Sequence, residues 1–277
     1  NWAARGAGIH LAGGRATVSD CLFATNGTGG YSGGAGTAGS GLYGSDVNPL
    51  VVSNCSFIGH YHHGSTSRNG VALYLTGAGN ARIVNCRVLN NVNAGNYEDV
   101  TINSSGQVEI RNTLMTAGTE RGILKNGTGS LGITNCLIYN YPQSAVIATT
   151  GTLSIGNCTI VNNGRWGVSN SYAYAAVLNS IIWGNTNGGA TNCTVQYSDI
   201  QDAVAGNGNR YLDPKFSGDA AGNFRLAVGS PCANEGTNET WMAGAFDLEG
   251  RKRLVGGRVD MGAYESDSGT GTILFVR

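Results

Sequence analysis

The sequence predicts an all-β protein whose chain winds into stacked coils, a parallel β-helix (β-solenoid). A six-residue phrase recurs eight times between residues 18 and 200. The strands it predicts are short, rich in Val and Ile, and bounded by Gly and Asn. No 3.6-residue periodicity of a helical repeat accompanies it. Each copy therefore closes one rung of about 22 residues, and successive rungs stack as parallel strands about 4.8 Å apart.

The copies of the phrase are unevenly spaced. Their fourth positions lie 34 residues apart at the start of the chain and 22 apart further on, which predicts insertions in the first rungs. The copies are Val18–Phe23, Val52–Phe57, Ile83–Val88, Ile110–Met115, Ile133–Ile138, Ile155–Ile160, Val177–Ile182 and the divergent Val195–Ile200.

Stacking predicts columns of like side chains. The first and sixth positions are apolar and are expected to form the core. The third position is Asn in six of eight copies, with Asp20 in the first. Side-chain amides stacked in this way can hydrogen-bond from rung to rung, and Asn tolerates the left-handed backbone of a tight corner.

The fourth position of the phrase holds five of the seven cysteines, and Thr113 and Ser180 share the row. Adjacent rungs are about 4.8 Å apart, more than the roughly 3.8 Å between the Cβ atoms of a disulfide. No Cys-x-x-Cys pair suggests zinc. We interpret this row as small, buried, reduced side chains; a disulfide between Cys193 and Cys232 stays open.

Charge and motifs restrict the class of function. Seventeen basic and seventeen acidic residues give a net charge of zero, which argues against a nucleic-acid partner. No apolar run has the length of a membrane span. The sequence contains no P-loop, dinucleotide fingerprint or calcium-binding repeat, so we expect no cofactor and no metal.

The chain divides into three parts. Residues 1–198 are expected to form the rungs. Residues 199–266 contain most of the carboxylates and are interpreted as a C-terminal cap, because the last rung of a coil is otherwise an open sheet edge. Residues 267–277 end in an apolar strand, Ile273, Leu274, Phe275 and Val276. This strand is expected to begin a further module, to be donated to a neighbouring subunit, or to pack on its own cap.

Several phrases carry a family resemblance: Ser180–Asn185, Tyr197–Ile200, Asp213–Phe216, Gly229–Pro231 and Asp260–Glu265. Together with the Asn-Cys rungs they resemble the right-handed parallel β-helix proteins of the bacterial choice-of-anchor Q type, over nearly the whole chain. The resemblance implies a right-handed coil and an exported or surface-anchored protein. It supplies no catalytic motif. The chain departs from that pattern by opening within a rung and by its trailing strand.

Counting back 15 residues from the Cys row places Glu98, Arg121, Gln143 and Arg165 on successive rungs. Glu98, Arg121 and Arg165 are therefore the candidate catalytic residues, because a carboxylate flanked by Arg suits proton abstraction next to a uronate. The structural alternative is a cross-rung ion pair at the surface.

Other side chains suggest ligands. His60, His62 and His63 form a His-rich segment, interpreted as an exposed polar loop rather than a metal site. Exposed aromatic rings offer stacking platforms for sugars; the candidates are Tyr31, Tyr43, Tyr61, Tyr74, Tyr97, Trp166, Tyr172, Tyr174 and Trp183.

Three functions remain open. The first is a non-enzymatic, extracellular or cell-surface structural or adhesive β-solenoid that self-associates into a fibre through residues 273–276. The second is a polysaccharide lyase or glycoside hydrolase. The third is a carbohydrate-binding module. Because one fold serves many functions, the fold alone does not decide among them; we favour the first.

Overall fold

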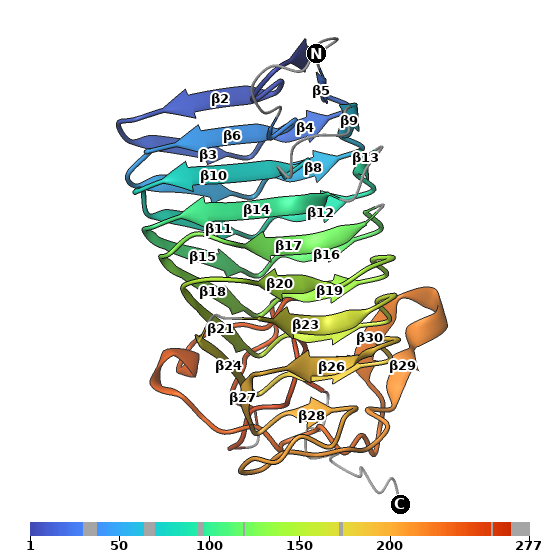
Figure 1. The fold of residues 1–277 in the computed structure, drawn as a ribbon. Helices are drawn as coiled ribbons and strands as arrows, with labels where there is room; N and C mark the ends of the chain where they lie inside the picture. Colours follow the sequence, from blue (N-terminus) through green and yellow to red (C-terminus); the bar gives the residue numbers. More distant parts are fainter. Residues whose placement is uncertain are drawn as a thin grey trace, which may run out of the picture.

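The computed structural model describes residues 1–29, 38–63, 70–93, 97–118, 120–171, 174–255 and 257–266. The chain forms a right-handed parallel β-helix, as the repeat and the resemblance predicted (Figure 1). Three parallel sheets of eight strands each run along the coil. In each rung the chain passes through the first, the second and then the third sheet.

The first sheet contains β2 (Ile9–Ala12), β6 (Leu42–Ser45), β10 (Leu73–Gly77), β14 (Glu98–Ser104), β17 (Arg121–Lys125), β20 (Val146–Ala148), β23 (Trp166–Asn170) and β26 (Gly188–Thr191). The second contains β3 (Ala16–Ser19), β7 (Leu50–Ser53), β11 (Ala81–Val84), β15 (Gln107–Arg111), β18 (Ser130–Thr134), β21 (Thr152–Gly156), β24 (Tyr174–Leu178) and β27 (Thr194–Gln196). The third contains β4 (Leu22–Ala24), β8 (Ser56–Ile58), β12 (Arg87–Leu89), β16 (Leu114–Thr116), β19 (Leu137–Tyr139), β22 (Thr159–Val161), β25 (Ile181–Trp183) and β28 (Asp199–Ile200).

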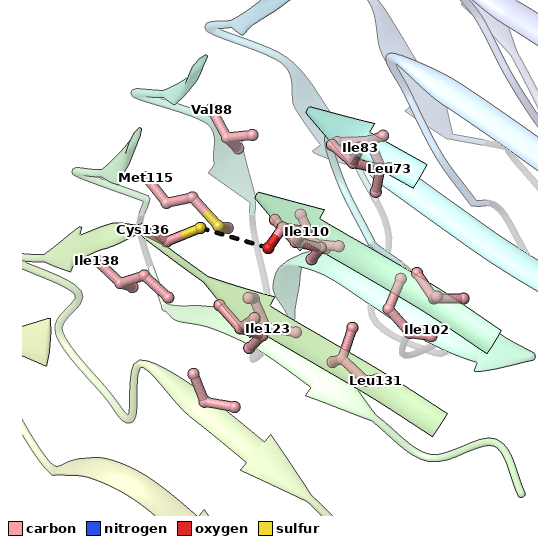
Figure 2. Close-up of a cluster of buried hydrophobic side chains, with 14 of the residues drawn as sticks. Leu73, Ile83, Val88, Ile102, Ile110, Met115, Ile123, Leu131, Cys136 and Ile138 are labelled. Atoms are coloured by element: carbon pink, nitrogen blue, oxygen red, sulfur yellow. Dashed lines mark hydrogen bonds between the residues drawn. The ribbon is translucent and has the colours of Figure 1, made fainter. Parts of the chain in front are cut away.

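The predicted core columns are present. The second-sheet strands pair in register, with Val18 beside Val52, Ile133 beside Ile155 and Val177 beside Val195. The first- and sixth-position side chains point into the space between the sheets, as Ile83, Ile110, Val88, Met115 and Ile138 do in Figure 2. All seven cysteines are free thiols, so Cys193 and Cys232 are not bonded to each other.

The predicted asparagine ladder is present from Asp20 to Asn135, along the corner between the second and third sheets, and does not continue to Asn157 and Asn179. Asn54 Nδ2 donates to Asp20 Oδ1 (3.1 Å), and Asn85 Nδ2 donates to Asn54 Oδ1 (3.2 Å). The same bond links Asn112 to Asn85 at 3.0 Å and Asn135 to Asn112 at 2.6 Å. Every member has a positive φ, between 48° and 60°, so the row favours Asn for its backbone as well as its amide.

The first rungs carry an additional sheet. It contains β1 (Trp2–Ala3), β5 (Gly27–Gly29), β9 (Tyr61–His63) and β13 (Val92–Asn93), in that order. These strands lie between the third and first sheets along the chain, where the early spacings predicted insertions. The insertions therefore lengthen one corner of the coil and leave the three main sheets in register.

Residues 199–266 do more than cover the end of the coil. Residues up to 212 meet the last rung: Tyr197 N donates to Asn207 O (2.7 Å) and Ile200 N donates to Arg210 O (3.0 Å). The strap, residues 213–255 and 257–266, then lies along the outer face of the third sheet and includes the hairpin of β29 (Phe216–Gly218) and β30 (Asn223–Leu226) (Figure 1).

The strap covers outward apolar side chains of the third sheet. Leu137 and Val161 pack against Phe224 and Tyr264 of the strap. Two single-turn 3-10 helices, Asp219–Ala221 and Thr240–Met242, are the strap's helical segments. Within the described ranges, no helix has the length and apolar character needed to cross a membrane.

Candidate functional site

Glu98 and Arg121 lie side by side on β14 and β17, as the rung count predicted. Arg121 Nη1 donates to Glu98 Oε1 at 3.1 Å. The Glu98 side chain is 0% exposed and that of Arg121 is 23% exposed. This carboxylate therefore already faces a guanidinium inside the protein and presents no surface to a polymeric substrate.

Arg165 does not belong to the same row, which corrects the predicted alignment. Ile123 pairs with Val146, and Val146 with Val168. Arg121 lies two residues before Ile123. The residues two positions before Val146 and Val168 are Ser144 and Trp166, so these two share the row of Arg121, and Gln143 and Arg165 do not. The corner before β18 spans residues 126–129, whereas the corner before β21 spans 149–151, one residue fewer. The prediction counted a fixed 15 residues back from the Cys row, which holds only where the corners have the same number of residues. Arg165 is exposed at the surface.

Lys125, which follows this pair on β17, points into the coil. It is 0% exposed, and Nζ donates to the carbonyl oxygens of Gly127 and of Thr150, the latter at 3.3 Å. Desolvation lowers the pKa of this ammonium group. Its contacts are with backbone corners, so we assign it a structural role.

The histidine segment is buried, contrary to the exposed loop we expected. His60 is 0% and His62 1% exposed. The segment forms β9 of the additional sheet instead of a loop. Burial lowers the pKa of His60 to about 4, and its Nδ1 accepts from Asn26 N at 3.2 Å. His62 Nδ1 lies 2.8 Å from Thr28 Oγ1. The side chain of His63 lies outside the described residues.

Asp99 is a buried carboxyl that the sequence analysis did not single out. The strand register places it in a row with Gly41, Ala72, Gly122 and Ala145, all small. Burial raises its pKa to about 7. The sequence signal for this buried group is a carboxylic acid in a row that otherwise contains only Gly and Ala.

The partners of Asp99 come from neighbouring rungs. Its Oδ2 accepts from Tyr141 Oη at 2.8 Å and from Asn91 Nδ2 at 3.5 Å. Gly118 makes room for them, since a Cβ there would lie 2.5 Å from Tyr141 Cε1 and 2.9 Å from Asp99 Oδ2. The cluster replaces apolar packing inside the coil and has no opening to solvent. No group of three or more metal-ligating side chains occurs in the described part of the chain.

The aromatic candidates separate by exposure. Tyr43 and Tyr97 are buried, and the ring of Tyr74 stacks on Tyr43 at 5.4 Å. Trp183 packs against Tyr211 near the strap, with centroids 5.8 Å apart. Tyr174 is 84% exposed and remains a platform for a ligand. Tyr31 and Tyr172 lie outside the described residues.

The outer face of the second sheet is open and carries charge. Two adjoining hollows of about 310 and about 260 Å³ share Gln107, Glu109 and Arg111. Glu109 Oε2 lies 3.3 Å from Arg82 Nε and 3.5 Å from Arg111 Nε. Glu109, Arg82 and Arg111 were not among the site residues predicted from the sequence.

Comparisons with known proteins give one structural likeness. No family model matches the sequence, and no curated protein matches it. A solved structure that is similar is the crystal structure of pectate lyase Pel9A, with 14% sequence identity and a TM-score of 0.47. The likeness covers 94% of this chain and 88% of that chain.

Proposed function

We propose that the protein is a non-enzymatic, adhesive or structural β-solenoid that works outside the bacterial cell or on its surface. The observation that carries the proposal is the burial of Glu98, the only carboxylate predicted for catalysis, in its ion pair with Arg121. The open surface of the second sheet is instead lined by Glu109 and Arg111, which are ion-paired with each other, and by hydroxyl side chains. Such a face is better suited to binding a ligand than to catalysing its reaction.

The finer parts of the proposal follow from the sequence. The resemblance to choice-of-anchor Q proteins supports membership of that type and an exported or surface location. Self-association through Ile273–Val276 is part of the same proposal; these residues lie outside the described ranges.

Incubation of the full chain with uronate-containing and neutral glycans tests the proposal. We expect retention of the chain on at least one immobilised glycan or on bacterial cells, and no new chain ends in any glycan. Turnover that disappears in an Arg121→Ala variant would instead identify a lyase or hydrolase. Electron microscopy of the native material tests the fibre separately: filaments are expected, and single particles at all concentrations would contradict self-association.

A further inference from the structure

The open groove of the second sheet runs along the axis of the coil. Its lining comes from β11, β15, β18 and β21, four successive strands. With about 4.8 Å between strands, the first and last of them are about 14 Å apart. A groove of this length and direction suits an extended polymer better than a single small molecule.

One end of the groove is basic. Arg82 and Arg111 both approach the same oxygen of Glu109, and their side chains are 60% and 38% exposed. Two guanidinium groups around one carboxylate leave a net positive charge. In each ion pair the guanidinium atom that approaches Glu109 is Nε, and no described residue accepts a hydrogen bond from the Nη groups of Arg82 or Arg111.

These N–H groups are suited to a planar or tetrahedral anion. A guanidinium binds carboxylates, sulfates and phosphates through two parallel hydrogen bonds. Exposed ion pairs such as those of Glu109 contribute little stability, so an incoming anion can share the guanidinium groups at small cost.

Beyond Glu109 the floor is flat and hydroxyl-rich. The next residues in its row are Gly132, Ser154 and Ala176. The parallel row starts at Gln107 and continues through Ser130 and Thr152. These groups offer hydrogen bonds to ligand hydroxyls, and the lining contains no deep apolar pocket for a peptide side chain.

Two aromatic rings lie beside the groove. Trp241 of the strap lies against Arg111, with 6.0 Å from the guanidinium carbon to the ring centroid. Its Nε1 donates to Glu239 Oε2 at 2.7 Å, which fixes the ring. The row of Gln107 ends on Tyr174, which is 84% exposed. Rings of this kind present apolar faces with a polar edge to a ligand.

We infer that this groove binds an extended acidic polysaccharide. Arg82 and Arg111 hold the carboxylate or sulfate of one sugar, the floor from Gln107 to Ser154 hydrogen-bonds the following sugars, and Tyr174 stacks on a sugar ring at the far end. The inference rests on the proposed adhesive function and gives that function a site and a ligand class.

The test measures affinities of the full chain for alginate, dextran sulfate and neutral dextran. The variant is Arg82→Gln/Arg111→Gln. The control, Arg165→Gln/Lys215→Gln, removes the same charge from exposed residues outside the groove. We expect the groove variant to bind the acidic polymers about tenfold or more weakly, with the control unchanged. Tyr174→Ala is expected to weaken binding by a smaller factor without changing its dependence on salt.

The outcomes separate the two proposals. Tighter binding of alginate identifies the carboxylate as the anion, and tighter binding of dextran sulfate identifies the sulfate. Equal losses in the groove and control variants, or preferential binding of poly-glutamate, would overturn the inference. Retention on neutral glycans alone would overturn it and leave the adhesive function standing. Cleavage of alginate would contradict the non-enzymatic function even if the groove variant lost binding.

Discussion

The first four and the last four rungs contain the same columns but are shielded from water in different ways. In the first rungs, insertions build the additional sheet of β1, β5, β9 and β13. In the last rungs, the strap covers the third sheet. One row of that sheet shows the difference: Leu22 in the first rung is 68% exposed, whereas Leu137 in the fifth is 1% exposed.

The buried polar side chains also change along the coil. The second to fifth rungs accommodate the buried polar groups of His60, Asn91, Asp99 and Tyr141, whereas the corresponding ladder of the later rungs contains Asn163 and Asn185, bonded at 2.8 Å. The outer face of the second sheet is open around the two hollows that share Gln107, Glu109 and Arg111. Each local addition to the repeat therefore covers one part of the coil, and the open part of the second sheet stays accessible to a ligand.

The largest expected effect lies in the strap. Arg253 is 0% exposed; its Nη1 donates to Glu265 Oε1 at 2.8 Å, and its Nη2 to Asn135 of the ladder. Arg253→Met leaves Glu265 buried without its cation, which is expected to lower the free energy of unfolding by about 3–5 kcal/mol. Urea denaturation measures this change.

The matched control for Arg253 is Arg225, whose ion pair with Glu249 is at the surface. Arg225→Met is expected to cost at most about 1 kcal/mol. If the two variants lost the same free energy of unfolding, the ion pair of Arg253 would not be what holds the strap on the coil.

A pair of leucines tests the cover of the third sheet. Leu137→Ala opens a cavity beneath the strap and is expected to destabilise by about 2–5 kcal/mol. Leu22→Ala, in the same row, is expected to change stability by no more than about 0.5 kcal/mol. Thermal unfolding of both variants provides the comparison, and a similar loss for Leu22 would mean that its face is covered too.

The buried carboxyl of the first rungs predicts a pH dependence. The pKa of Asp99 is about 7 in the folded chain, against 3.8 for the ordinary group. Between these values the unfolded chain binds fewer protons, so the free energy of unfolding falls as the pH rises from 4 to 7.

The Asp99→Asn variant lacks this contribution. Its stability relative to the original chain is therefore expected to improve from pH 4 to pH 7 and to stay constant above. His60, whose pKa is lowered to about 4, titrates in both proteins. Its contribution therefore cancels when the free energy of unfolding of the original chain is subtracted from that of the variant. Parallel stability curves would contradict the burial of an ionisable Asp99.

The smallest effect concerns the ladder. Asn112 has φ 48° and takes part in two ladder bonds. Asn112→Gly loses the bonds but tolerates the backbone, whereas Asn112→Ala loses the bonds and is strained. We expect the Ala variant to be less stable than the Gly variant by about 1 kcal/mol. Equal stabilities, measured by chemical denaturation, would show that the left-handed backbone does not select Asn.

The sequence predicted features that the repeat determines. Columns such as Val18 to Val195 and the Asp20–Asn135 ladder followed from stacking alone. Features that depend on corner length were missed: one residue fewer before β21 shifted Arg165 out of the predicted row. The course of the strap depends on contacts distant in sequence, such as Asn179 Nδ2 with Thr237 O at 2.9 Å, which local patterns do not encode. Predicting the Arg82–Glu109–Arg111 site would have required both the strand register and the knowledge of which side chains face outward.

Arginine-selective labelling read by mass spectrometry tests most directly whether the open face of the second sheet is the binding surface. Phenylglyoxal is added to the intact chain with and without a saturating amount of alginate. Binding in the groove predicts that alginate protects Arg82 and Arg111 from labelling and leaves Arg165 fully reactive. Unchanged labelling of Arg82 and Arg111, or equal protection of all exposed arginines, would contradict it.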